Sequence, residues 1–91
     1  MNMPAEIQKN LVNVIIRHFG QKGADRIWID ARELREIYDL PLSYVPILTN
    51  FLNYLYHQTW GKSRFPFGVT ARREVEGNGR LQYIWEVQKT I

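Results

Sequence analysis

The sequence predicts an α+β fold in which three helices pack on a small antiparallel sheet, in the order α-β-α-α-β-β. Apolar residues recur at helical spacing through much of residues 4–59. A helix-capping pattern that begins at Asp30 directly follows a short β-prone run at 26–29. Near the C-terminus, two runs of strand-forming residues flank a glycine-containing turn at 77–79. We therefore expect the three helices to precede a C-terminal hairpin.

The length and composition fit one small domain that spans residues 1–91. A chain of 91 residues buries only roughly two thirds of its unfolded surface, so its core must be well patterned. Hydrophobic residues make up 45% of the chain, which is sufficient for a globule. No apolar run approaches the roughly 20 residues that cross a bilayer, and residues 1–10 lack the pattern of a secretory signal. Because cysteine is also absent, we expect a cytoplasmic protein without disulfides.

The first helix is expected over residues 4–19. Pro4 suits a first turn, where its missing N–H needs no partner, and Gly20 and Gly23 are expected to end the helix. Val12 and Ile16 widen the apolar stripe beyond what one small core needs. They are either ordinary core residues or the face of a homodimer, and we favour the homodimer. The stripe itself consists of Ile7, Leu11, Val14, Ile15 and Phe19.

A short strand at 26–29 is expected to run straight into a helix over 31–39. Asp30 is a good N-cap, and Glu33 has the spacing of a capping box. Ile29 and Leu34 have the spacing of a hydrophobic staple across the same helix start. Pro41 should end this helix and force a turn.

The third helix is expected over residues 44–59, with Ser43 as its cap. Pro46 falls in the first turn, where proline is tolerated. One face is apolar, and the loop GKSRFPFG follows the helix. The apolar face is formed by Val45, Leu48, Leu52 and Leu55, with Phe51 beside it.

Strands at 67–76 and 80–88 are expected to form a hairpin. A three-residue loop, Gly77 to Gly79, makes one face of the hairpin almost wholly apolar, whereas loops of two or four residues mix the faces. We therefore predict that the apolar face packs on the core and that Arg72, Arg80 and the tip project. The loop of three residues pairs Val75 with Leu81, Arg73 with Tyr83, Ala71 with Trp85, and Val69 with Val87.

The order and lengths of these elements resemble those of the winged-helix superfamily. The resemblance covers residues 5–88 and rests on architecture and on the pattern DARELREIYDLPLSYVPILTNFLNYL, without a signature motif. In this pattern, the usual core positions are matched by Leu34, Val45, Leu48 and Leu52. The resemblance implies that the third helix enters the DNA major groove and that the hairpin lies on the backbone or in the minor groove.

Carried over to this chain, the resemblance implies base-reading residues on the third helix. Asn50, Asn53 and His57 have the spacing of one exposed face. Asparagine can bond adenine, and threonine can contact a thymine methyl group. The same residues are equally compatible with an ordinary solvated surface. The candidate readers are Tyr44, Thr49, Asn50, Asn53 and His57.

The third helix departs from the usual pattern because it holds neither arginine nor lysine. Phosphate contacts must then come from other elements. Glu74 and Glu76 dilute the positive charge of the hairpin. The candidate phosphate contacts are Arg72, Arg73 and Arg80 on the hairpin, Lys62 and Arg64 in the loop, and Arg32 and Arg35 on the second helix.

Signals for catalysis are weak. No glycine-rich phosphate loop follows a strand, and GQKG and GNG read as a helix end and a turn. No carboxylate has ligand spacing to His18 or His57. We therefore expect no enzyme, no cofactor and no metal.

Two hypotheses remain for the function. The first is a winged-helix regulator of transcription that binds double-stranded DNA as a homodimer. The alternative is a winged-helix protein–protein interaction module that binds no nucleic acid. The charge-free third helix favours this alternative, because interfaces enrich aromatic residues and deplete charge. Its candidate contacts are Tyr44, Ile47, Tyr54 and Tyr56.

Overall fold

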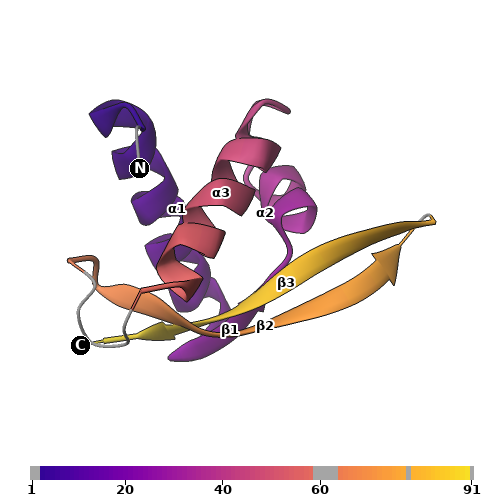
Figure 1. The fold of residues 1–91 in the computed structure, drawn as a ribbon. Coiled ribbons are helices and arrows are strands. Elements are labelled where there is room, and N and C mark those ends of the chain that lie inside the picture. Colours follow the sequence, from indigo (N-terminus) through magenta and orange to yellow (C-terminus); the bar gives the residue numbers. More distant parts are fainter. Residues whose placement is uncertain (1–2, 59–63, 78, 91) are drawn as a thin grey trace.

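The computed structural model describes residues 3–58, 64–77 and 79–90 and has the predicted α+β architecture. The strands form one antiparallel sheet in the order β1-β3-β2, and all three helices lie on one side of it (Figure 1). The predicted element order is confirmed. The elements are α1 (Ala5–Lys22), β1 (Arg26–Ile29), α2 (Ala31–Ile37), α3 (Tyr44–Tyr56), β2 (Phe67–Gly77) and β3 (Arg80–Lys89).

The sheet has an inner face under the helices and an outer face turned away from them (Figure 1). Strand β1 alternates between the two, because successive side chains of a strand point to opposite faces. Ile27 and Ile29 are buried on the inner face, whereas Arg26 and Trp28 are exposed on the outer face. Strand β1 pairs with only the second half of β3, from Trp85 onward.

The core lies between the helices and the inner face. Trp85, at the centre of the sheet, is 1% exposed. Phe51 of α3 packs edge-on to Phe65 and Phe67, with ring centres 5.2 and 6.5 Å apart. The other buried apolar residues are Leu11, Ile15, Phe19, Ile27, Ile29, Ala31, Leu34, Leu48, Leu52, Leu55, Val69 and Val87.

Helix α1 continues to Lys22, three residues beyond the predicted end. Gly20 lies inside the helix, where a glycine costs only about 1 kcal/mol relative to alanine. The end comes at Gly23, which has a φ of +61° and donates its N–H to the Gly20 carbonyl. The left-handed residue, and not the first glycine, therefore ends the helix.

The predicted N-cap of α2 at Asp30 is confirmed. The carboxylate of Asp30 accepts the backbone N–H groups of Arg32 at 2.9 Å and Glu33 at 3.4 Å. The helix ends at Ile37, two residues earlier than predicted. Asp39 then takes a φ of +51°, and the N–H of Leu40 donates to the Arg35 carbonyl at 2.9 Å, which closes a Schellman-type end.

Ser43 is the N-cap residue of α3, as predicted, but the expected capping by its side chain is not found. Ser43 itself has helical backbone angles, and its side chain makes no capping hydrogen bond. Instead, Tyr44 and Val45 donate their N–H groups to the carbonyls of Pro41 and Leu42. The carbonyls of the tight turn before α3 therefore accept N–H groups at the helix start, where a bond to the Ser43 side chain was expected. The helix ends at Tyr56, three residues before the predicted end at 59. Residue 59 itself lies outside the described residues.

The predicted register of the hairpin is also wrong over its outer half. Gly77 pairs with Arg80, so Arg72, and not Ala71, lies opposite Trp85. Val69 pairs with Val87 as predicted, because a β-bulge between Val69 and Ala71 absorbs one residue. The outer half of the hairpin extends beyond the helices (Figure 1), so burial of one face does not dictate the register there.

His18 is a buried polar residue between α1 and α2, 4% exposed. Its Nδ1 lies 2.8 Å from the hydroxyl of Tyr38. Burial lowers the pKa of His18, and the positive charge of Lys22 lowers it further, whereas Glu33 acts in the opposite direction. The folded chain therefore favours a neutral imidazole.

This environment predicts acid sensitivity. The unfolded chain binds a proton at His18 as the pH falls through the ordinary value of 6.5, whereas the folded chain does so only at lower pH. The free energy of unfolding should therefore fall below that pH and level off once the folded chain also binds the proton. Urea titrations across this range measure the slope, which His18→Gln should reduce. Equal slopes for His18→Gln and for the unmodified protein would contradict this role of His18.

Candidate nucleic-acid interface

The solvent side of α3 is polar but uncharged. Leu48, Phe51, Leu52 and Leu55 bury one side of the helix, which leaves the opposite side to solvent. Asn50 and His57 are exposed there, and Tyr54 is 38% exposed. The other predicted readers, Tyr44, Thr49 and Asn53, are half-buried.

Asn53 connects α3 to the hairpin. Its side-chain oxygen accepts the indole N–H of Trp85 at 2.9 Å and an Arg72 guanidinium N–H at 3.1 Å. A buried indole N–H requires an acceptor, and Asn53 supplies it. The residue predicted to read bases is thus held by contacts within the fold.

Arg72 does not project, contrary to the prediction. Its guanidinium carbon lies 4.4 Å from the ring centre of Tyr56 and 4.2 Å from that of Tyr83. A planar guanidinium favours such contacts with aromatic rings. The β-bulge turns Arg72 to the inner face, where it packs against α3 and is half-buried.

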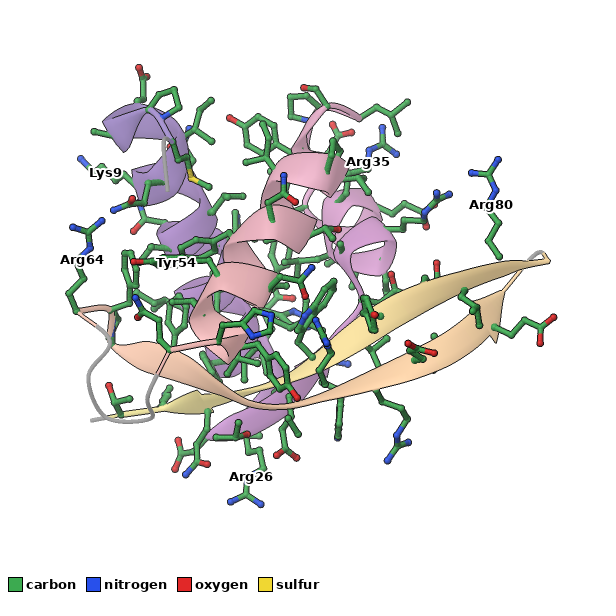
Figure 2. The ribbon with its side chains drawn as sticks, in the orientation of Figure 1. Lys9, Arg26, Arg35, Tyr54, Arg64 and Arg80 are labelled. Atoms are coloured by element: carbon green, nitrogen blue, oxygen red, sulfur yellow. The ribbon has the colours of Figure 1, made fainter. Side chains whose placement is uncertain are left out.

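Other predicted phosphate contacts lie away from α3. Arg73 lies on the outer face of the sheet, with its guanidinium carbon 5.0 Å from the centre of the Trp28 ring. Arg64 donates to Gln8 of α1 at 3.3 Å and lies at the opposite end of the sheet from Arg80 (Figure 2). Lys62 lies outside the described residues.

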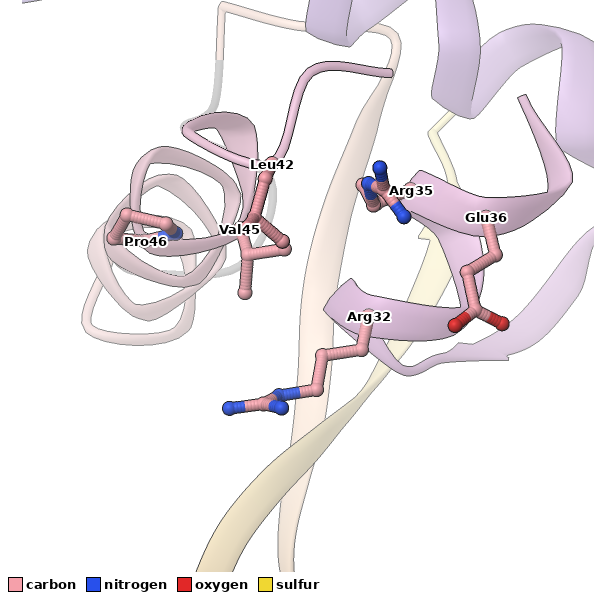
Figure 3. Close-up of a pocket in the computed structure, with 6 residues that line it drawn as sticks. All are labelled: Arg32, Arg35, Glu36, Leu42, Val45 and Pro46. Carbon is pink, nitrogen blue, oxygen red and sulfur yellow. The ribbon is translucent and has the colours of Figure 1, made fainter. Parts of the chain in front are cut away.

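Three of the predicted arginines do gather beside α3. Arg32 and Arg35 of α2 face Val45 of α3 across a hollow of about 370 Å³ (Figure 3). An adjoining hollow of about 230 Å³ lies between α3, the start of α2 and β3, and Arg32, Thr49 and Arg80 line it. We call Arg32, Arg35, Thr49 and Arg80 the arginine groove.

The groove is partly organised before any ligand binds. The Nε of Arg35 donates to the Leu40 carbonyl at 2.9 Å, which orients the guanidinium. Glu36 lines the first hollow too, and Asp30 lines the second. Asp30, Glu33 and Glu36 line a third hollow of about 700 Å³ together with Arg32 and Arg80. Among the residues that the structure describes, however, the ion pair found is Lys89 with Asp25, so no carboxylate neutralises a groove arginine within 4.0 Å.

The predicted homodimer face is only partly open. Ile16 is 44% exposed on α1, whereas Val12 is half-buried against the core.

In the described ranges, no helix has the length and apolar character needed to span a membrane. No group of three or more potential metal ligands occurs in the same ranges.

Comparison with family models, with curated proteins and with solved structures gives no match in any of the three.

Sequence reasoning missed the contact between Asn53, Trp85 and Arg72. One signal was available, since a tryptophan expected in the core needs a hydrogen-bond acceptor for its indole N–H. The partner was hidden, because it lies 32 residues away and depends on the hairpin register. The same register error assigned Arg72 and Arg73 to the wrong faces of the hairpin.

The contact predicts different effects for two asparagines of α3. Asn53→Ala leaves the buried Trp85 N–H without its acceptor and should lower the free energy of unfolding by about 1–3 kcal/mol. Asn50→Ala, at an exposed position on the same helix, should change it by less than about 0.5 kcal/mol. Urea titrations of both variants measure the difference. Equal effects would show that Asn53 carries no structural hydrogen bond of consequence.

Proposed function

We propose that this chain is a winged-helix domain that binds double-stranded DNA and acts as a small regulator of transcription. The supporting observation is the arginine groove, which places Arg32, Arg35 and Arg80 along one flank of an uncharged polar helix. A helix that enters the major groove needs polar readers on its own surface and cations on its flanks. Helix α3 and its two neighbours meet that requirement.

The set of base readers is narrower than the sequence predicts. Asn50, Thr49 and His57 stay available, whereas the oxygen of Asn53 already accepts bonds from Trp85 and Arg72. Asn50 has a free amide with the donor and acceptor that adenine requires. In this proposal, α3 faces the major groove, and the β2–β3 hairpin is the wing.

Phosphate contacts in this proposal come from α2 and the wing. Arg32 and Arg35 lie where the second helix of such a domain crosses the backbone, and Arg80 lies near the tip of the wing. Three contacts of this kind give a salt dependence of about −2.7 in log K against log salt, at about −0.9 per contact. Affinity should therefore be modest and should fall steeply with salt.

The test is fluorescence anisotropy with a labelled duplex of random sequence at several salt concentrations. The double variant Arg32→Ala/Arg80→Ala should weaken binding and make the salt slope shallower by about 1.8. The variant Lys9→Ala/Arg26→Ala removes the same charge from surfaces away from the groove and should bind nearly as the unmodified chain does (Figure 2). Absence of DNA binding at low salt, or an equal loss of affinity in both double variants, would contradict the proposal.

A protein-interaction module is the second candidate, and one observation favours it. Tyr54 is 38% exposed on α3, and Leu42, which precedes the same helix, is 72% exposed. Exposed aromatic and aliphatic side chains on an uncharged helix are typical of interface centres. Under this alternative, a Tyr54→Ala variant loses function, whereas the arginine double variant keeps it.

A further inference from the structure

Trp28 is exposed on the outer face of the sheet, on the side away from the arginine groove. Its side chain is 40% exposed, although tryptophan is usually well covered. Half-buried Ile84 of β3 lies on the same face, paired with Arg73 of β2. No described helix covers this face (Figure 1). We call Arg26, Trp28, Arg73 and Ile84 the tryptophan face.

Two arginines flank the exposed ring. The guanidinium carbon of Arg73 lies 5.0 Å from the Trp28 ring centre, which brings a cation across the sheet from β2 to β1. Arg26 is exposed, points away from the helices (Figure 2) and donates to Gln88 at 3.4 Å. Within the described part of the chain, neither arginine has a carboxylate in ion-pair distance.

The acidic residue of this face is already engaged. Glu86 pairs with Trp28 in the sheet, but its carboxylate accepts the hydroxyl of Thr70 at 2.8 Å. Among the described residues, the face therefore presents two arginines without an ion-pair partner around an apolar centre, and the Glu86 carboxylate bonds to a hydroxyl. This surface has the composition of an interface centre, because tryptophan and arginine are enriched among residues that dominate binding energy.

We propose that the tryptophan face docks an acidic segment of a partner protein. An aliphatic or aromatic side chain of the segment covers Trp28 and Ile84, and flanking Asp or Glu residues pair with Arg26 and Arg73. The charge of the face selects this occupant, since paired carboxylates offset the desolvation of both arginines.

A nucleic acid fits the same face less well. Arg73 already lies over the Trp28 ring, so a base has less open ring to stack on. The proposal is also independent of the proposed function, because α3 and the arginine groove lie on the other side of the sheet.

The test pans the full chain against a phage-displayed library of short random peptides. Selected peptides should converge on an apolar residue bracketed by Asp or Glu. Binding of a synthetic consensus peptide should shift the fluorescence of Trp28 to shorter wavelength. Its Kd, measured by anisotropy, should rise at least about tenfold in Trp28→Ala and in Arg73→Ala.

Matched variants separate peptide binding at the tryptophan face from DNA binding at the arginine groove. Arg32→Ala/Arg80→Ala should bind the peptide normally, and Trp28→Ala should bind duplex DNA as the unmodified chain does. Arg26→Glu, at an exposed position, tests the charge requirement should Trp28→Ala fail to fold, and it should weaken binding of the acidic peptide in the same direction.

Three results would overturn the proposal. The first is selection of peptides without acidic residues, or a peptide Kd that is unchanged in Trp28→Ala, Arg73→Ala and Arg26→Glu. The second is binding of single-stranded oligo(dT) that is lost in Trp28→Ala, which would make the face a nucleic-acid surface. The third is concentration-dependent self-association, seen by sedimentation and abolished by Trp28→Ala, which would make the occupant a second copy of the chain.

Discussion

The hydrogen bonds of the Asn53 side chain connect the middle of the sheet to α3. Trp85 occupies the centre of the sheet, where it pairs with Ile29 on one side and with Arg72 on the other. Its indole donates to Asn53, so one side-chain oxygen links α3 to the middle strand. Arg72 adds a second bond from β2 and packs against Tyr56 and Tyr83. Helix α3 and this part of the hairpin are therefore linked, and Arg72 is held on the helix side of the sheet.

Features that depend on neighbouring residues could be predicted from the sequence, whereas the pairing of distant strand residues could not. The cap at Asp30 and the order of elements depend on neighbours in the chain, and both were predicted correctly. The end of α1 failed because two glycines compete, and only the backbone angle of Gly23 decides between them. The hairpin register failed because the prediction assumed that one face is buried along its whole length. Beyond the helices, that assumption has no physical basis.

The candidate interface was predicted in part, and the missing part follows from the same cause. Arg32, Arg35 and Arg80 come together because α2 and β3 both border α3. Their meeting could be expected from element order alone. Arg72 and Arg73 are adjacent in the sequence, and their different environments depend on strand register, which charge patterning cannot report. A formal net charge of +3 likewise says nothing about how the basic residues are divided among separate surfaces.

The extra residue in β2 has a consequence for how this chain can change over evolutionary time. With the bulge at Thr70, even-numbered Arg72 faces the helices and odd-numbered Arg73 faces the other way. A strand without the bulge reverses this parity along the whole outer segment, as side chains alternate strictly. The same residues paired without the bulge, with one more residue in the turn at the tip, would therefore exchange the environments of the two arginines without substituting either. A change of pairing in this strand, without a point mutation at either arginine, would redistribute charge between the two sides of the sheet.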